Sequence, residues 1–297
     1  MNIHKNLKGN LILMITAIIW GVSFVSQSVG MDFIGPCTFN GIRTLLGAVV
    51  LIPFILFSDK KNNFRKMTEK EKHDLILGGI TCGVLLCIAS TIQTLGIKYT
   101  TTAKSGFITA MYIIFVPFTG FFMKKKVGIV TYAGALIALA GLYMLCMSGE
   151  SLNINIGDIL TLVCAIFFTF HILAVDYFSA RVNGVKLACL QFFVSGIINI
   201  ILMLILEKPD FTIVKSCWMP ILYSGIMSCG MGYTLQIIGQ KYTDPTPAAI
   251  IMSMEAVFAA LAGFVLLNES LEPIQILGCI VMFAAILIVQ IPPKKKI

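Results

Sequence analysis

The stretch QTLGIKYT at residues 93–100 recurs as QIIGQKYT at residues 236–243. The two copies share Gln, Gly, Lys, Tyr and Thr at a constant offset of 143 residues. The same offset, continued without a gap, pairs Tyr112 with Glu255. Matches at one fixed spacing indicate an internal repeat, in which each copy is a structural unit.

The repeat extends on both sides of this match. Gly134 pairs with Gly278 at an offset of 144 residues. AIIWGVSF at residues 17–24 pairs with AIFFTFHI at residues 165–172 at an offset of 148. We therefore expect the two halves of the chain to share one fold.

The composition identifies the solvent of these two units. Of the 297 residues, 58% are hydrophobic and 12% are charged, and the mean hydropathy is +0.92. A soluble domain has about 45–50% apolar and about 25% charged residues, and a globule of this size cannot hide the excess from water. A disordered chain is excluded too, because it requires low hydrophobicity. Most of the chain must therefore lie in lipid.

About ten apolar stretches are long enough to cross a hydrocarbon core of ~30 Å as helices. Polar residues, or Gly and Pro, separate them. The predicted spans are residues 10–30, 35–57, 75–97, 102–123, 128–147, 157–178, 185–206, 217–239, 246–267 and 274–291.

Each copy of the repeat, residues 1–148 and residues 149–297, thus contains five spans. An odd number of spans forces the second copy to cross the membrane in the opposite orientation. We therefore predict an all-α membrane protein of ten transmembrane helices, arranged as two inverted five-helix repeats. Such repeats are typical of secondary transporters, whose substrate site lies near the midplane between the halves. A duplicated structural protein without transport is the alternative.

Lys and Arg in the short connections predict the orientation. With the N-terminus inside, the inner segments carry 17 of these residues and the outer connections carry 4. We therefore expect a multi-pass protein of the cytoplasmic membrane with both termini in the cytoplasm. The repeat agrees, because the inner residues 124–126 are lysines whereas their outer counterparts include Asn268 and Glu269.

Three motifs resemble the EamA-type group of the drug/metabolite transporter (DMT) superfamily: WGVSF at residues 20–24, RTLLGA at 43–48 and MEAVFAALAGFVLLNESLEPIQILG at 254–278. The resemblance covers essentially the whole chain. It implies transport of a small metabolite, often export of an amino acid or a related compound. It also implies a central cavity built from spans one to four and six to nine, with spans five and ten at the periphery. Ala256 and Asn268 depart from the family pattern, in which Pro and Gly are frequent at these positions.

Two charged residues lie deep inside predicted spans, where charge is expensive and marks a candidate functional site. Glu255 is about nine residues from the inner end of its span, and Arg43 is about eight from the outer end of its span. At about 1.5 Å per residue their depths differ by only a few ångströms, so a Glu255–Arg43 ion pair is geometrically feasible. We predict that both bind substrate; a purely structural ion pair is the alternative.

Polar side chains at helical spacing add further candidates. Trp20, Ser23 and Gln27 share one face of the first span, and Thr109 and Tyr112 share one face of the fourth. We predict that these faces border the cavity and bind substrate. Packing between helices is the alternative role, above all for the Trp side chain.

Gln93 and Gln236 occupy the same repeat position in spans three and eight, and we predict that both bind substrate. Such buried amides can also tie helices together. His171 lies in span six, and we predict that it too contacts substrate. The ordinary pKa of a histidine is near neutrality. Together with Glu255, His171 could relay a proton and couple transport to a proton gradient. A neutral histidine that only bonds to its neighbours is the alternative.

The sequence offers no support for a metal or another cofactor. Most of the nine Cys lie inside apolar runs, there are three His, and no Cys-x-x-Cys or Cys/His cluster appears. The net charge of +8 resides in the connections between spans. The expected partners are a small-molecule substrate and the lipid bilayer, with no nucleic acid; monomer and homodimer both remain open.

The leading interpretation is a secondary transporter that moves a small metabolite by alternating access, with an unknown coupling ion. An uncoupled facilitator, or an uptake carrier for a small polar solute, is the first alternative. A membrane enzyme or sensor is the second. The sequence has no P-loop for ATP-driven pumping and no Gly-x-Ser-x-Gly or His-Glu-x-x-His motif for an enzyme.

Overall fold

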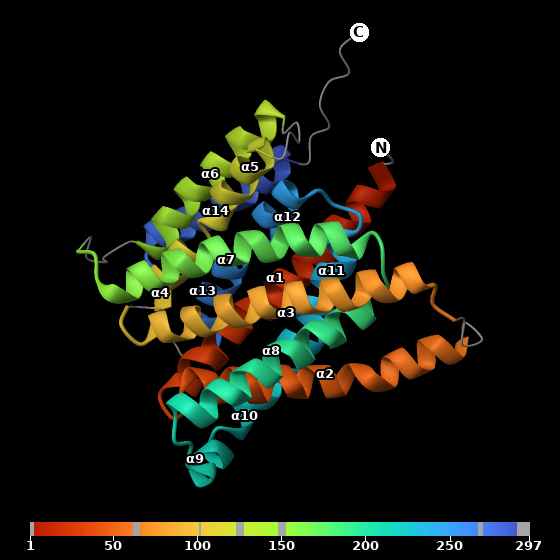
Figure 1. The fold of residues 1–297 in the computed structure, drawn as a ribbon. Coiled ribbons are helices and arrows are strands. Elements are labelled where there is room, and N and C mark those ends of the chain that lie inside the picture. The colour runs from red at the N-terminus through yellow and green to blue at the C-terminus, as the bar shows by residue number, and fades with distance from the viewer. Residues whose placement is uncertain are drawn as a thin grey trace.

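The protein is a bundle of helices, seen in a computed structural model that describes residues 3–61, 66–100, 102–122, 128–147, 153–266 and 270–289 (Figure 1). The helices of the first half are α1 (Ile3–Met31), α2 (Pro36–Lys61), α3 (Glu69–Ile97), α4 (Thr102–Thr109), α5 (Tyr112–Phe122) and α6 (Ile129–Cys146). The second half comprises α7 (Ile156–Ser179), α8 (Gly184–Leu206), α9 (Phe211–Ser216), α10 (Trp218–Leu222), the π-helix η1 (Tyr223–Tyr233), α11 (Thr234–Gln240), α12 (Pro245–Met252), α13 (Glu255–Leu266) and α14 (Pro273–Val289).

Each of the ten predicted spans is mostly helical over its described residues. In the described part of the chain, eight helices are long and apolar enough to cross a membrane, and two shorter apolar helices, Lys104–Thr119 and Pro273–Val289, account for spans four and ten. Span eight is formed by α10, η1 and α11, which follow one another without a break. The short helix α9 has no counterpart among the predictions; the side chain of Asp210 caps its first turn.

The connection predicted at residues 58–74 is shorter than expected, because α2 continues to Lys61 and α3 already begins at Glu69. The signal for the early start of α3 is a capping box. The Thr68 side chain accepts a bond from the Glu71 backbone N–H, and the Glu71 carboxylate accepts one from the Thr68 N–H. This motif satisfies two backbone donors that a helix end otherwise leaves open, so the charged first turn of α3 is stable beyond the apolar span.

Spans four and nine are both broken in the middle, at equivalent positions. The first break, at residues 110–111, lies between α4 and α5, and the second, at residues 253–254, lies between α12 and α13. Their backbone bonds correspond one to one: Ala110 N–H donates to Gly106 O over 3.1 Å, and Ser253 N–H donates to Ala249 O over 3.0 Å. Pro117 of span four lies inside α5 and not at the break. Each break therefore belongs to the repeated fold and does not depend on a proline.

The packing of the helices follows the repeat. Equivalent helices pack against each other in two pairs, α2 with α8 and α6 with α14. The contact of α3 with α7 has its counterpart in the contact of α11 and η1 with α1. In Figure 1, α6 and α14 run side by side along one edge of the bundle, far from α2. This agrees with the peripheral position that the family resemblance implies for spans five and ten.

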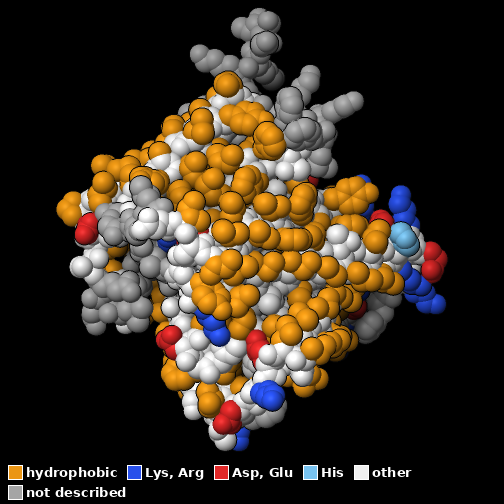
Figure 2. Space-filling view, turned by 60° about the vertical axis from the view of Figure 1, so that its left-hand side comes forward, with side chains coloured by type: hydrophobic (Ala, Val, Ile, Leu, Met, Phe, Trp, Pro, Cys, Tyr) orange, Lys and Arg blue, Asp and Glu red, His pale blue; other side chains and the backbone are white. Residues whose placement is uncertain are grey.

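The described surface is mostly apolar. Figure 2 shows hydrophobic side chains across the middle of one face, with most charged side chains near its margins. Large side chains such as Phe57, Leu204 and Val265 are more than two-thirds exposed. A water-soluble protein does not expose apolar patches of this extent, whereas hydrocarbon is a suitable solvent for them.

Some predictions fall outside the described residues. These include the lysines at 124–126, their counterparts Asn268 and Glu269, and the C-terminal lysines at 294–296. The nine Cys are all described; each is a free thiol, eight are buried and Cys279 is half-buried. The prediction that they are small apolar side chains in the bundle agrees with this placement.

Candidate functional site

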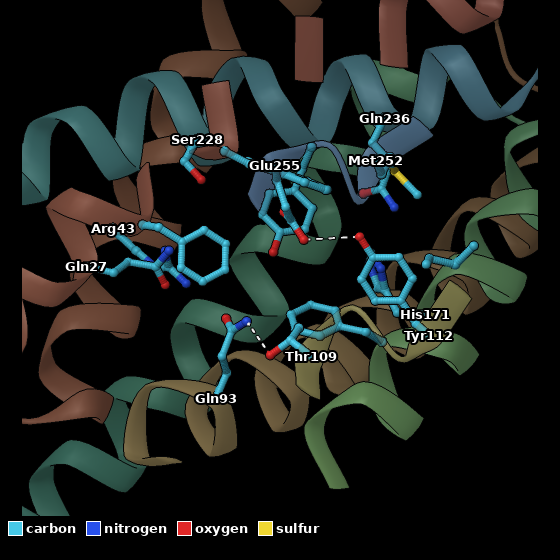
Figure 3. A pocket seen from close by; sticks show the side chains of 15 residues that line it. Gln27, Arg43, Gln93, Thr109, Tyr112, His171, Ser228, Gln236, Met252 and Glu255 are labelled. Atoms are coloured by element: carbon cyan, nitrogen blue, oxygen red, sulfur yellow. Dashed lines mark hydrogen bonds between the residues drawn. The ribbon is translucent and has the colours of Figure 1, made fainter. Parts of the chain in front are cut away.

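A small pocket of about 40 Å³ lies in the interior of the bundle between the two halves (Figure 3). This central pocket has room for a few water molecules. It is lined by Trp20, Phe24, Gln27, Arg43, Gln93, Thr109, Tyr112, Phe168, His171, Ile172, Ser228, Tyr233, Gln236, Met252 and Glu255. Spans one to four, six, eight and nine contribute, whereas no described residue of α6, α8 or α14 does.

The central pocket is built from pairs of equivalent residues. At the repeat offsets of 143 and 148, ten of the lining residues form five pairs across the two halves. These pairs are Trp20 and Phe168, Phe24 and Ile172, Gln93 and Gln236, Thr109 and Met252, and Tyr112 and Glu255. The pocket therefore lies where the symmetry axis of the repeat would pass.

The two helix breaks place Tyr112 and Glu255 opposite each other. Tyr112 is the first residue of α5 and Glu255 is the first residue of α13. The Tyr112 hydroxyl donates a hydrogen bond to Glu255 Oε1 over 3.1 Å, as the dashed line in Figure 3 marks. Both side chains are more than nine-tenths buried. A carboxylate is thus held in the interior by a bond to its own repeat counterpart.

Arg43 lies at one end of the pocket, beside Gln27 (Figure 3). Its Nε donates to Asn40 Oδ1 over 2.8 Å, and its guanidinium carbon lies 5.4 Å from the centre of the Phe39 ring. The Asn40 amide donates in turn to Thr94 Oγ1 over 2.9 Å. Arg43 is 3% exposed, and the ion pair with Glu255 that its depth made feasible is not formed. Both side chains nevertheless border the same pocket.

His171 is fully buried and bonds to Gln191, with Nε2 3.1 Å from Gln191 Oε1. It borders the pocket but forms no bond to Glu255 among the described contacts. Its ring lies edge-on to the ring of Tyr233 at 6.1 Å between centroids. His171 and Glu255 are therefore close enough to share the pocket, and any proton relay between them would run through water or substrate.

Several buried polar atoms that border the pocket have no hydrogen-bond partner in the described part of the chain. These are Trp20 Nε1, Gln27 Oε1, His171 Nδ1 and Gln236 Oε1. Gln93 differs, since its amide donates to Thr109 Oγ1 over 3.3 Å. Buried polar groups in native proteins are nearly always bonded. Their convergence on one pocket is the geometry of a site that receives a polar ligand or water.

Nine of the ten predicted binding residues line the central pocket, and Ser23 is the exception. Ser23 is fully buried, and its backbone carbonyl accepts a bond from the Gln27 amide over 3.4 Å. It lies one turn from Gln27 on the same helix, next to the pocket but outside its lining.

Sequence reasoning missed Tyr233 and Ser228, which both line the pocket. Tyr233 is the centre of an aromatic cluster: its ring centroid lies 4.6 Å from that of Trp20 and 5.8 Å from that of Phe192. Both residues belong to η1, the π-helix. A π-helix changes the spacing of side chains on a face, so a search at α-helical spacing does not find them.

A second, larger cavity of about 240 Å³ adjoins the central pocket, and we call it the side cavity. Phe24 and Glu255 border both spaces. Most of the remaining lining is small or apolar, and polar side chains appear towards the α13–α14 connection. The other lining residues are Val25, Ser28, Gly106, Leu145, Cys146, Ala256, Ala259, Ala260, Gly263, Ser270, Leu271 and Gln275.

The described residues contain no group of three or more His, Cys, Asp or Glu that could hold a metal ion. The site is therefore described without a metal.

A model of the EamA-like transporter family matches the chain twice, over residues 7–147 and residues 155–291. An uncharacterized transporter of Archaeoglobus fulgidus is 31% identical over 97% of this chain and 87% of its own length. An uncharacterized transporter of Clostridium kluyveri is 24% identical over 92% of this chain and 90% of its own length. The uncharacterized transporter YoaV of Bacillus subtilis is 22% identical, with coverage of 91% and 92%.

The fold is also similar to a solved crystal structure, with a TM-score of 0.76. The match covers 95% of this chain and 96% of that chain at 17% sequence identity. At this identity the likeness concerns the fold alone.

Proposed function

The chain belongs to the EamA-like transporter family, and from this premise we propose that it is a secondary transporter that exports a small metabolite across the cytoplasmic membrane by alternating access. The family is one of multi-pass membrane transporters in the DMT superfamily, and not of enzymes. The proposed substrate is an amino acid or a related compound. The two proposed five-helix repeats are residues 1–148 and residues 149–297.

The observation that carries this proposal is the arrangement of charge and unpartnered polar atoms around the central pocket. A cation, Arg43, and a carboxylic acid, Glu255, border one pocket, and no ion pair between these two described residues is formed. A compound with a carboxylate and an amino group matches this arrangement, because its carboxylate can bind the planar guanidinium and its amino group can bind Glu255. Gln27, Gln93 and Gln236 would complete the hydrogen bonding of its polar atoms.

We assign the remaining predicted residues as follows. Trp20 and Tyr112 form aromatic walls of the substrate site, and Thr109 and His171 add polar contacts. Ser23 supports Gln27 through its backbone carbonyl. The structure in this state has too little space for an amino acid in the central pocket alone, so binding requires the walls to move or the substrate to extend into the side cavity.

Proton coupling through His171 and Glu255 is the proposed energy source. Both groups border the same pocket, and a buried carboxylic acid that meets the substrate amino group can exchange its proton for that ligand. Flux through wild-type protein in liposomes should then respond to an imposed pH gradient, and the response should disappear in His171→Phe while uncoupled exchange persists. A wild-type flux that is indifferent to the gradient would contradict the coupling and leave the transport proposal intact.

The proposed orientation places both termini in the cytoplasm, from the excess of Lys and Arg at that end of the bundle. A single chain supplies every residue of the central pocket, so the proposed activity needs no second copy; either a monomer or a homodimer fits it. The proposed partners are the small-molecule substrate and the lipid bilayer.

The test is ligand-induced stabilisation of purified protein against a panel of amino acids and related compounds, because a ligand that binds the native state raises its apparent stability. At least one zwitterionic compound should raise the unfolding midpoint of the wild type. The shift should vanish in Arg43→Gln and in Glu255→Gln and persist in Leu261→Gln, a residue of α13 that is 42% exposed. Equal shifts in all variants would remove both charges from the substrate site.

A further inference from the structure

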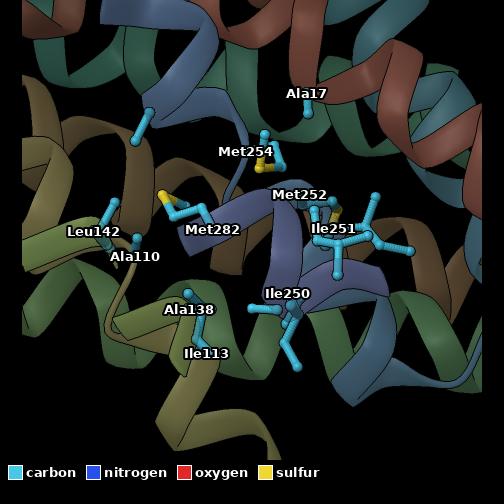
Figure 4. Close-up of a cluster of buried hydrophobic side chains, with 14 of the residues drawn as sticks. Ala17, Ala110, Ile113, Ala138, Leu142, Ile250, Ile251, Met252, Met254 and Met282 are labelled. Carbon is cyan, nitrogen blue, oxygen red and sulfur yellow. The ribbon is translucent and has the colours of Figure 1, made fainter. Parts of the chain in front are cut away.

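The side cavity has an exact counterpart in the repeat, and that counterpart is filled. Ala256, Ala259 and Gly106 border the side cavity. At the offset of 143 residues their equivalents are Ile113, Val116 and Ala249. These three belong to the large apolar cluster of the bundle and are 0%, 1% and 0% exposed. Ala256 belongs to the same cluster but is 8% exposed, and Ala259 and Gly106 are half-buried. Figure 4 shows Ile113 within this cluster, which also includes Ala138 and Ile250.

The difference between the two regions lies in packing and not in the backbone. Both regions begin at a helix break with the same hydrogen bonds, for example Ile113 N–H to Ala110 O and Ala256 N–H to Ser253 O. Phe24 of α1 and Ile172 of α7 are equivalent residues on the helices that face the two regions. Phe24 borders the side cavity, whereas Ile172 belongs to the apolar cluster. One fold thus holds two arrangements of equivalent elements, one hollow and one closed.

From this asymmetry we propose that the filled region around Ile113, Val116 and Ala249 is the closed inner gate of the transport path, and that the side cavity is its open outer counterpart. The transport step then exchanges the two packings: the side cavity closes around Ala256 and Ala259 while the region around Val116 opens to the cytoplasm. This inference rests on the proposed function and orientation. It assigns gating residues that lie outside the substrate site.

The polar ties between helices define the bodies that move. At one end of the bundle, Lys104 of α4 forms an ion pair of 2.6 Å with Asp158 of α7, and Thr100 donates to the same carboxylate over 2.6 Å. At the other end, the equivalent contact is Thr243 to Asn10 of α1, at 3.1 Å. Each tie joins elements from both halves of the sequence.

Two bodies follow from these ties, one formed by α3, α4, α5 and α7 and the other by η1, α11, α12, α13 and α1. The side cavity lies between them, since α4 borders it on one side and α1 and α13 on the other. Closure of the side cavity therefore needs a rocking of one body against the other, and the same motion separates α5 from α12 at the filled end.

The experiment measures access to the filled region and needs no known substrate. In the single variant Val116→Cys, a membrane-impermeant maleimide applied to inside-out vesicles should react slowly, because the state with the closed inner gate predominates. Adding Ala259→Trp fills the side cavity and disfavours the outer-open state. The labelling rate at position 116 should then rise about tenfold, as expected when a state populated at about 1% reaches about 10%. The native cysteines give the background, which the same vesicles without Val116→Cys measure.

Leu261→Trp is the matched control, since residue 261 lies two positions further along α13 and is 42% exposed; it should leave the labelling rate unchanged. Ala259→Leu, a smaller change, replaces Ala259→Trp if the latter does not elute as a folded protein. An unchanged rate in a folded Ala259→Trp variant would show that the filled region is permanent core and overturn the proposal. A rise in labelling without any measurable flux would support the gate and contradict the transport proposal, so the two failures are distinguishable.

Discussion

At the scale of single residues, some equivalent positions of the repeat carry the same residue at the site and others carry different residues. Gln93 and Gln236 are identical across the repeat, whereas Tyr112 and Glu255 differ and bond to each other over 3.1 Å. A perfectly symmetric pair of carboxylic acids at this place would repel when ionised. The Tyr112 phenol instead provides a donor for Glu255, so this pair contains a single carboxyl group.

The site was largely predictable at this scale for a physical reason. Charged and amide side chains are costly in apolar spans, so Arg43, Glu255 and Gln236 stand out without any structure. Asn40 did not stand out, because in the sequence it is only a polar residue near the start of a helix. Its role is to accept a hydrogen bond from Arg43 Nε, one turn further along α2. Tyr233 was hidden by the changed spacing of the π-helix.

Asn40→Ala tests the positioning of Arg43. The variant leaves the buried Nε without its acceptor and Thr94 without the amide donor. We expect a loss of about 1–3 kcal/mol of stability, the typical cost of an unsatisfied buried group, together with weaker substrate binding. Thermal unfolding in detergent checks the first effect, and Asn40→Asp, which retains an acceptor, should restore most of the binding. A fully stable Asn40→Ala variant with normal binding would show that Arg43 needs no such support.

At the scale of elements, the helix breaks position the site. Spans four and nine were predicted as continuous helices, because no Gly or Pro marks residues 110–111 or 253–254. The breaks are tolerated because they are buried in protein beside a cavity, the only setting in which irregular backbone is stable at membrane depth. Capping explains the other differences at this scale, as in the early start of α3 at Thr68.

Helix crossings depend on glycine at a few positions. A Cβ on Gly157 of α7 would lie 2.7 Å from the Gly96 carbonyl oxygen of α3, which cannot move aside. Gly157→Ala should therefore lower the unfolding midpoint by separating the two helices, at a cost of about 1–3 kcal/mol for overpacking. Gly106→Ala is the control, since nothing lies within 4 Å of a Cβ at that position. Similar midpoints for the two variants would contradict the close crossing.

The carboxylate of Glu207, at the end of α8, caps α2. It accepts bonds from Cys37 N–H over 2.8 Å and from Thr38 N–H over 2.9 Å. A negative charge at a helix N-terminus also interacts favourably with the helix dipole and stabilises the helix. Glu207→Ala should cost about 1–2 kcal/mol, and Glu207→Gln, which keeps an acceptor oxygen, should cost less. Equal losses for both variants, measured by thermal unfolding, would show that the contact contributes through packing and not through capping.

At the scale of the whole molecule, α2 and α8 fasten the two halves at both ends. At the end opposite Glu207, Asp59 of α2 forms an ion pair of 2.8 Å with Lys186 of α8, and these two residues are the repeat equivalents of Glu207 and Thr38. An interface between α2 and α8 that is bonded at both ends suits a fixed axis of rotation. Rocking about this axis then requires the other ties between the halves to stay within one body or to break.

The ion pair of Lys104 and Asp158 joins the two halves of the sequence, and both side chains are less than one-tenth exposed. Lys104→Met leaves the carboxylate buried without its cation, which typically costs about 3–5 kcal/mol. We expect a clearly lower unfolding midpoint for Lys104→Met and a value near wild type for Lys104→Arg. Loss of stability in both variants alike would indicate that the shape of the Lys side chain, and not its charge, matters here.

The central claim is that a single pocket between the halves, bordered by Arg43 and Glu255, carries a solute across the membrane. Counterflow in proteoliposomes tests it most directly: vesicles loaded with one unlabelled compound from an amino-acid, sugar and nucleobase panel are supplied with its labelled form outside. We predict accumulation of label for at least one amino acid or related compound, reduced more than tenfold in folded Glu255→Gln protein, a loss of about 1.4 kcal/mol or more of interaction at the site. No accumulation for any compound with wild-type protein, or equal accumulation with Glu255→Gln, would contradict the account.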